Sequence, residues 1–355
     1  MLQLTYGHQQ QFRWRHHDIN LLGKTDLKLP IQRSVYRLNG SAPVHFYVES
    51  VPEPGGKIYP WGTKTPSVLR LRDLPGHFNI EIPIHDPNLQ VGWNQIEIEI
   101  ANHAREVETL VARFHWHPQP IPLPLDLRNL SHYTSIQEIA QVVDGTFELD
   151  SQRNIIRSCT PVGSDILLLL GSPSSSQEAT YEVTFAALNQ DSGFLGLSDF
   201  FAGHVEQSRE LGIKPGYATS GLATIDTEGY PQLWIAWGDC LYDKADTWVI
   251  HTEKKRKLPI RPGVTYCVRH QIIIQAGLNR GRFRIWKKGN PEPDVWVCQT
   301  DNHDLAVHLP RPGQASFGLF QYWGLPTEWS NIYVRALEDT ITPTVEQYHS
   351  IPIIQ

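Results

Sequence analysis

At 355 residues the chain is long enough for two domains, each with its own hydrophobic core. Apolar residues make up 40% and charged residues 19%, which excludes a disordered chain. The formal net charge of −6, spread without long runs of one sign, excludes the basic domain that nucleic-acid binding requires.

The N-terminal residues lack the apolar core of a secretory signal, and the longest apolar run, Ile166 to Leu170, is too short to cross a bilayer. We therefore expect no membrane insertion and a cytoplasmic location, with unconventional export as the alternative. The cysteines have no C-x-x-C spacing, which argues against zinc and favours buried thiols, with disulfides left open for an exported protein: Cys159, Cys240, Cys267 and Cys298.

Short alternating strands separated by turn residues fill the first third of the chain. The segment Asn94–Ile100 places three Ile on one face and two Glu on the other, which is the pattern of an antiparallel strand with one wet face. Asn39-Gly40 is a two-residue turn that suits a hairpin. Roughly six such strands predict an immunoglobulin-like β-sandwich over residues 1–117.

Alternating prolines from His117 to Pro124 then force a stiff, extended segment, and we predict a proline-rich linker over residues 118–130. Ser135 followed by Glu138 is a capping-box signal and predicts a helix near Ser135 to Val143, although Ala140 to Val143 fits the start of a strand equally well. Ten or so longer strands follow, joined by short loops. They predict an all-β jelly roll over residues 131–340, with a C-terminal tail at 341–355.

Several stretches of this second half resemble the concanavalin A-like lectin/glucanase superfamily, whose members include laminin-G-like jelly rolls. The stretches are Val142–Phe147, the Tyr181-Glu182-Val183 run, Arg284–Trp296 with its W-x-x-G-x-x-E-P-x-x-W pattern, Gly318-Leu319 and Ser330–Val334. The resemblance implies a two-sheet jelly roll and, for many members, a carbohydrate ligand.

The departures from that superfamily are equally informative. The E-x-D-x-E strand of its glucanases is absent, as are the R-x-E-x-R and Q-x-H strands of its alginate lyases. Ser330 stands where calcium-binding members often carry an acidic residue, so we expect no cofactor; a structural calcium would have to use Asp144 or backbone carbonyls.

A candidate ligand site follows from period-two alternation in the segment Thr265–Gln275 and in the next strand. If the two segments pair as a hairpin, Arg269, Gln271, Arg284 and Trp286 share a solvent-facing side. An aromatic ring beside two guanidinium groups and an amide suits a polysaccharide, and an anionic one especially, because Arg binds carboxylates in a bidentate manner. The alternative is an ordinary solvated sheet face with Trp286 packed under a loop.

Other aromatic and histidine residues are weaker candidates. Trp237 and Trp323 lie at strand ends, where either could stack against a sugar or pack into the core. His204 follows a glycine and precedes a variable loop, so it is a candidate general base if its imidazole is exposed and has a carboxylate or tyrosine partner. His115 and His117 face one side of a strand, but no third ligand accompanies them, which favours a surface pair over a metal site.

The leading hypothesis is a lectin-like protein that binds a polysaccharide in the concave face of the jelly roll, with the N-terminal domain as a spacer or a docking module for a protein partner. The first alternative is a glycoside hydrolase or polysaccharide lyase of the same fold that uses His204. The second is a structural or interaction protein of an assembly. Fold alone does not choose among them.

Overall fold

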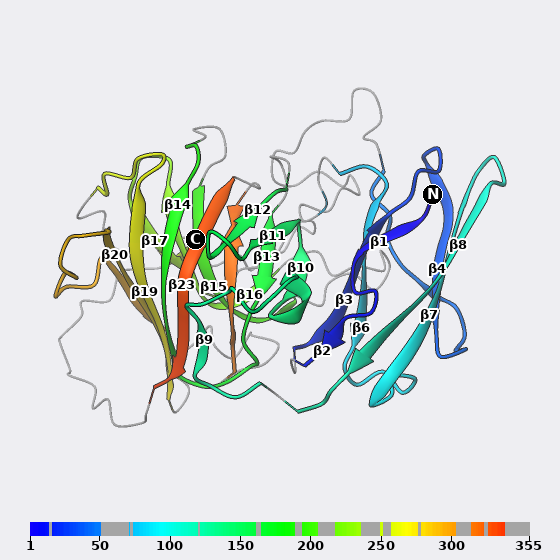
Figure 1. Ribbon diagram of the computed structural model, residues 1–355, viewed down its shortest axis with the longest axis horizontal. Coiled ribbons are helices and arrows are strands. Elements are labelled where there is room, and N and C mark those ends of the chain that lie inside the picture. Colours follow the sequence, from blue (N-terminus) through cyan, green and yellow to red (C-terminus); the bar gives the residue numbers. More distant parts are fainter. Residues whose placement is uncertain are drawn as a thin grey trace.

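The computed structural model describes most of the chain: residues 1–13, 16–50, 71, 74–119, 121–160, 165–188, 194–204, 217–235, 249–250, 257–275, 278–302, 314–322 and 326–337. The described part is built from β-strands, which confirms the all-β class predicted from the alternating patterns. The strands form four sheets, of three, five, seven and eight strands. Figure 1 shows the N-terminal strands, blue to cyan, beside the later strands, green to red.

The first two sheets enclose one hydrophobic core. They have the orders β1-β3-β6 and β2-β8-β7-β4-β5, and their bounds are β1 (Gln3–Tyr6), β2 (Gln11–Phe12), β3 (Asp18–Lys24), β4 (Ile31–Leu38), β5 (Val44–His45), β6 (His77–Pro83), β7 (Gly92–Asn102) and β8 (Val107–Trp116). In β7, Ile96, Ile98 and Ile100 are buried, as their alternation predicts, and they pack with Ile80 and Phe114. The immunoglobulin-like arrangement expected for this sandwich stays a prediction.

The other two sheets form a sandwich around the largest core of the protein. The seven-stranded sheet has the order β10 (Gln141–Asp144), β13 (Ile166–Leu169), β22 (Ser316–Gln321), β15 (Phe194–His204), β16 (Tyr217–Asp226), β17 (Pro231–Trp234) and β18 (Val249–Ile250). The eight-stranded sheet has the order β11 (Phe147–Asp150), β12 (Ile155–Ser158), β23 (Thr327–Ala336), β14 (Gln177–Phe185), β19 (Thr265–Gln275), β20 (Leu278–Lys287) and β21 (Cys298–Asn302), and β9 (Leu125–Leu127) pairs with β23. Two facing antiparallel sheets are the jelly-roll architecture expected from the sequence.

The helix predicted near Ser135 to Val143 is much shorter than expected. Only the 3₁₀ turn η2 (Ile136–Glu138) forms, and its N-cap Ser135 makes the predicted capping box with Glu138. The chain then forms β10 instead of a longer helix. Val142 and Val143 are buried on opposite faces of the sheet, which the alternating side chains of a strand allow. Within the predicted linker, Leu125–Leu127 form β9 and are paired with β23 of the eight-stranded sheet.

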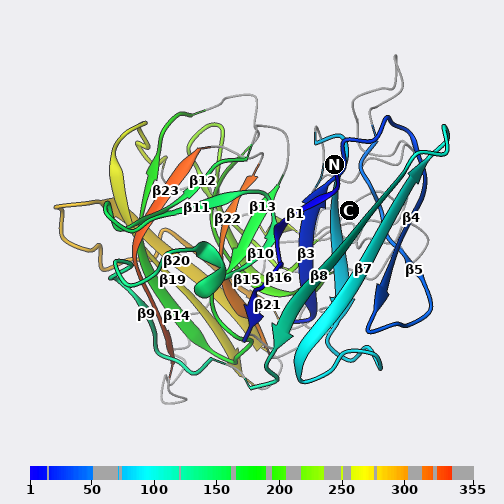
Figure 2. The ribbon, with the colours of Figure 1, turned by 45° about the vertical axis from the view of Figure 1, so that its right-hand side comes forward.

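The first sandwich packs against β10 of the seven-stranded sheet and β11 of the eight-stranded sheet through buried polar contacts. Tyr6 Oη donates to the carbonyl oxygen of Phe147 and accepts from its N–H, both at 2.9 Å. The Gln141 amide donates to the carbonyl of Asp18, and the Asn79 amide donates to the carbonyl of Val143. Figure 2 shows β1 and β3 beside β10. The outer face of the seven-stranded sheet is therefore partly covered by the N-terminal strands, whereas β14, β19 and β20 of the eight-stranded sheet lie on the side away from them (Figure 1).

No described helix is long and apolar enough to cross a membrane.

Candidate functional site

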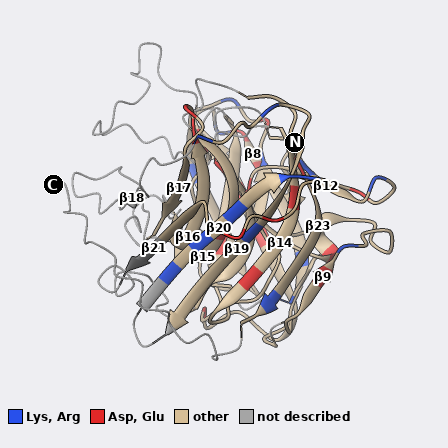
Figure 3. Cartoon of the chain, turned by 90° about the vertical axis from the view of Figure 1, so that its left-hand side faces the viewer, with Lys and Arg blue, Asp and Glu red and all other residues tan. Residues whose placement is uncertain are grey.

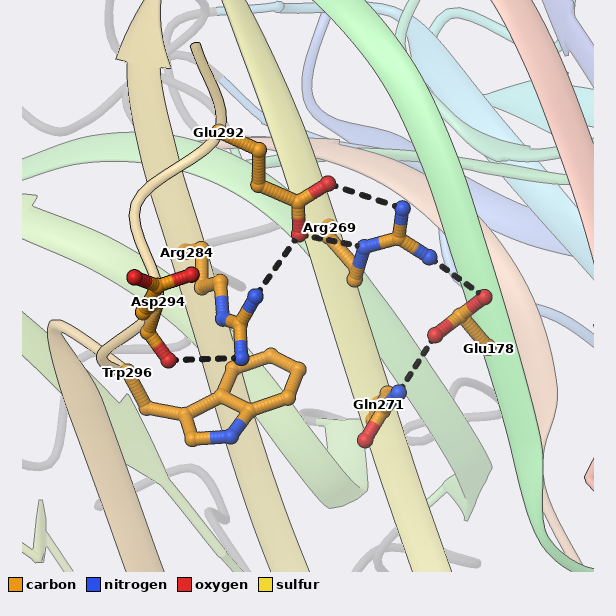
Figure 4. Close-up of a pocket in the computed structure, with 7 residues that line it drawn as sticks. All are labelled: Glu178, Arg269, Gln271, Arg284, Glu292, Asp294 and Trp296. Carbon is orange, nitrogen blue, oxygen red and sulfur yellow. Dashed lines mark hydrogen bonds and ion pairs between the residues drawn. The ribbon is translucent and has the colours of Figure 1, made fainter.

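A cleft of about 460 Å³ lies on the outer face of the eight-stranded sheet. Its lining comes from three neighbouring strands and one loop: Glu178 of β14, Arg269 and Gln271 of β19, Arg284 of β20, and Glu292, Asp294 and Trp296 of the segment between β20 and β21. Figure 3 looks onto this sheet and shows basic and acidic segments on adjacent strands. Figure 4 shows these residues, with Arg269, Gln271, Glu178 and Glu292 close together and Asp294 and Trp296 at the edge of the group beside Arg284.

The register of the strands explains why these side chains meet. Arg269 lies opposite Arg284, and Gln271 lies opposite both Glu178 and Arg282. Residues directly opposite in an antiparallel pair point to the same face. The alternate residues, among them Val268 and Phe283, are buried in the core and fix which face is outward.

Arg269 is the centre of the ion-pair network. Its Nε and Nη2 donate to the two carboxylate oxygens of Glu292 at 2.7 and 2.9 Å, and its Nη1 donates to Oε1 of Glu178 at 2.7 Å. The hydrogen bonds from Arg269 to Glu292 raise the pKa of the guanidinium further above its usual range. The arginine is thus held in one orientation between two carboxylates, as Figure 4 shows.

The loop after β20 folds back over the sheet and supplies the other wall of the cleft. Glu292 also accepts from Arg284 Nη1 at 3.0 Å, and the carbonyl oxygen of Asp294 accepts from Arg284 Nη2 at 2.9 Å. The guanidinium groups of Arg282 and Arg284 lie 4.3 and 4.2 Å from the ring centroid of Trp296, within the range of a cation–π contact. The loop is therefore anchored by charge and by stacking.

Both glutamates of the cleft are held in the ionised state. Burial alone would raise the pKa of Glu178, but the hydrogen bond from Gln271 and the charges of Arg269 and Arg335 outweigh it and lower that pKa. The hydrogen bonds from Arg269 also lower the pKa of Glu292, against a smaller effect of burial. A carboxylic acid that donates a proton in glycoside hydrolysis needs the opposite shift, so neither glutamate is arranged as a general acid.

Three of the residues predicted to bind a ligand, Arg269, Gln271 and Arg284, line the cleft together. Trp286 is on the same face, two residues beyond Arg284 and opposite Cys267, and it does not line the cleft. The aromatic side chain that lines the cleft is Trp296. Trp237 and Trp323 lie outside the described residues. The concave curvature expected of this face stays a prediction.

Sequence reasoning missed Glu178, Glu292, Asp294 and Trp296 as site residues. The last three stand in the E-P-x-x-W part of the segment that carries the superfamily resemblance, so the signal was present. Period-two alternation could not reveal their role, because they lie in a loop whose path the strands do not determine.

His204 is buried, and the expectation that Gly203 exposes its imidazole is wrong. Its side chain is 1% exposed, and its Nε2 lies 3.4 Å from Oε1 of Glu81 in β6. The ring of Tyr217 is 5.9 Å away between centroids. The histidine thus has a carboxylate and a tyrosine nearby, but it sits where the first sandwich meets the seven-stranded sheet. Its role as a general base stays a prediction.

His115 and His117 lie on one face of the first sandwich, as expected, with ring centroids 4.1 Å apart. Burial, followed by the charges of His115 and Arg13, lowers the pKa of His117. Among the described residues, no group of three His, Cys, Asp or Glu side chains is placed to hold a metal ion.

No protein-family model matches the sequence, and no curated protein sequence matches it. The solved structures that resemble this chain include the following three. The carbohydrate-binding module CBM66 from Bacillus subtilis is 15% identical, with 56% of this chain and 96% of that chain covered and a TM-score of 0.35. Alginate lyase Aly36B is 14% identical, with 61% and 98% covered and a TM-score of 0.38. Lectin II from Ulex europaeus is 13% identical, with 61% and 99% covered and a TM-score of 0.39. Similarities at this level do not identify a ligand for this chain.

The cleft has the general chemistry of a binding site for a polar ligand. Fixed hydrogen-bond donors and acceptors converge beside one aromatic side chain, and their positions are set by strands and by a doubly anchored loop. Such preorganised polar groups lose little freedom when a ligand binds.

Proposed function

We propose that the protein binds carbohydrate in the cleft on the outer face of the eight-stranded sheet. The observation that carries the proposal is that three acidic residues, two arginines and a glutamine line one cleft together with Trp296. Sugar hydroxyls both donate and accept hydrogen bonds, and the C–H face of a sugar ring packs on an aromatic side chain. The volume of the cleft is within the usual range for small-ligand sites, about 300–1,000 Å³.

Binding without catalysis fits the cleft better than hydrolysis or elimination. Arg269 holds both glutamates as charged hydrogen-bond acceptors, so neither has a proton to give to a leaving group. The enzymatic alternative, which uses His204, requires a polysaccharide to reach a side chain that is 1% exposed.

The test is calorimetric titration of the protein with a panel of neutral and acidic polysaccharides, combined with analysis of the sugars released. We expect saturable binding, no shortened products, and a loss of affinity of about tenfold or more in Trp296→Ala. Trp93→Ala is the matched control, because Trp93 is an exposed indole (55%) on the first sandwich and should not contribute.

Thermal unfolding of both variants separates loss of the binding surface from loss of the fold. A panel in which nothing binds, or a Trp296→Ala variant that binds as tightly as the unmodified protein, would refute the proposal. Released oligosaccharides that persist in the Trp296→Ala variant would favour the enzymatic alternative at a different site.

A further inference from the structure

The charged groups of the cleft determine which class of carbohydrate it can accept. The sequence alone favours an anionic polysaccharide, because Arg269 and Arg284 were expected to face solvent together. In the structure, every side-chain nitrogen of Arg269 already donates to a protein carboxylate. Nη1 of Arg284 donates to Glu292, and its Nη2 donates to the carbonyl oxygen of Asp294. The side-on pair of N–H groups of Arg269, from Nε and Nη2, is already taken by Glu292, so a ligand carboxylate would have to displace Glu292 to form that bidentate pair.

The overall charge around the cleft gives little net attraction for an anion. Among the lining residues, the two arginines face three carboxylates, those of Glu178, Glu292 and Asp294, which leaves a formal charge of 2 − 3 = −1. The adjacent Arg282 and Arg335 raise the sum only to +1, and Arg335 is itself paired with Glu178 at 2.9 Å. A uronate would lose hydration on entry and would meet carboxylates at short range, which is unfavourable.

Among the described lining residues, Asp294 carries the one side-chain acceptor that no described protein group uses. This residue is exposed at the rim, and its side chain accepts no hydrogen bond from any described residue; only its backbone carbonyl is used. A carboxylate only accepts hydrogen bonds, so a ligand that replaces its hydrating water has to donate them. Hydroxyl groups of a sugar do so, and two neighbouring hydroxyls can donate to the two oxygens of one carboxylate. A uronate or sulfate group is ionised at neutral pH and only accepts.

We infer that the cleft selects neutral sugars, which it binds through adjacent hydroxyl groups on the Asp294 carboxylate, and that it discriminates against uronic acid and sulfated polysaccharides. This inference rests on the proposed function and names the ligand class of the same site. The arginines then act by holding Glu178, Glu292 and the loop in place, and Trp296 supplies the apolar wall. On this inference the arginines hold the hydrogen-bond acceptors of the cleft in position and do not themselves bind an anionic ligand.

The decisive experiment compares polysaccharides that differ only in the charged group. Polygalacturonate and alginate are each titrated beside their carboxyl-reduced, neutral forms, and a panel of neutral glucans, mannans and fructans is titrated in parallel. We expect each detectable interaction to be with a neutral chain, with the uronate form bound at least about tenfold more weakly. Raising NaCl from about 0.05 to 0.5 M should change the affinity for the neutral chain by less than about twofold, because no ion pair forms with the ligand.

Two variants of Asp294 test the named contact. Asp294→Ala should weaken binding of the neutral chain by about tenfold or more, since the free acceptor is lost. Asp294→Lys should also lose the neutral chain but gain affinity for the uronate form. Asp86→Ala is the control, because this carboxylate lies in a turn of the first sandwich, where it accepts from the N–H of Asn88. Circular dichroism and thermal unfolding confirm that each variant is folded.

The outcomes separate the inference from the function beneath it. Tighter binding of a uronate than of its reduced form, strong loss of affinity with salt, or an unchanged Asp294→Ala variant would overturn the neutral-sugar inference while leaving carbohydrate binding intact. Absence of binding to every neutral and acidic chain would overturn the proposed function itself.

Discussion

Replacing Asp199 with asparagine should make the protein more stable, and increasingly so as the pH rises. Asp199 lies in β15, between β16 and β22, and its side chain is completely buried. Oδ1 accepts from the hydroxyl of Thr219, and Oδ2 is buried without a hydrogen-bond partner among the described residues. Burial raises the pKa of this carboxyl from its ordinary 3.8 to about 8, against a smaller opposing effect of the Thr219 hydrogen bond. The native protein therefore carries Asp199 as a neutral acid at pH 7.

The pKa shift sets the size and the sign of the effect. Between pH 3.8 and about 8 the unfolded chain has released this proton and the native state keeps it, so the free energy of unfolding falls by about 1.4 kcal/mol per pH unit. At pH 7, which is about three units above 3.8, the accumulated cost is at most about 4 kcal/mol. Asparagine has nearly the same shape, accepts from Thr219 in the same way and does not titrate. Its gain should approach that value at pH 7 and vanish near pH 4.

The assay is urea unfolding of the unmodified protein and Asp199→Asn at a series of pH values from 4 to 8.5. Asp294→Asn serves as the control, because that carboxylate is exposed and accepts no hydrogen bond from any described residue. A stability difference that does not grow with pH would refute the reasoning, since it would mean that Asp199 is ionised in the native state. A destabilised Asp199→Asn variant at pH 8 would refute it as well.

Three further predictions follow from other buried positions. Burial lowers the pKa of His270 to about 3, so acidification from pH 6.5 towards 3 should lower the free energy of unfolding. In His270→Gln the free energy of unfolding should fall less over the same pH range, measured in the same urea series. Gly145→Ala should cost more than about 2 kcal/mol in urea unfolding, because Gly145 has φ +85° and an added Cβ would lie 2.3 Å from Cγ2 of Ile166; a cost below about 0.5 kcal/mol would contradict this. Tyr6→Phe should cost about 2–4 kcal/mol, because it leaves the N–H and the carbonyl of Phe147 without the Tyr6 hydroxyl, and an unchanged unfolding midpoint would show that the two sandwiches do not depend on this contact.

His270 and Asp199 together predict the shape of the stability profile. The histidine makes stability rise with pH between about 3 and 6.5, and the aspartate makes it fall between 3.8 and about 8. Their slopes oppose each other from about pH 4 to 6.5 and should nearly cancel there. A plateau in that window, lost in either single variant, is the combined signature of the two buried groups.

The candidate site was predictable where it depends on strand alternation and not where it depends on the loop. Arg269, Gln271 and Arg284 could be assigned to one face because side chains alternate along a strand and because a hairpin fixes which residues are opposite. The partners that determine their chemistry could not be assigned. Glu178 is 91 residues away from Arg269 in the chain, and Glu292 reaches it only because the loop after β20 folds back.

The sequence by itself determined the all-β class, the alternating buried positions such as Ile96 and Ile98, and the capping box at Ser135, because each depends on the conformational preferences of neighbouring residues. Only the tertiary structure decided that the arginines of the cleft are neutralised and that His204 lies against Glu81 of the other sandwich. Burial and ion pairing depend on which distant surfaces come together, and local periodicity carries no information on that. Strand alternation alone predicts an anion-binding face, whereas the ion pairs of Arg269 and Arg284 are the basis of our inference that the ligand is a neutral sugar.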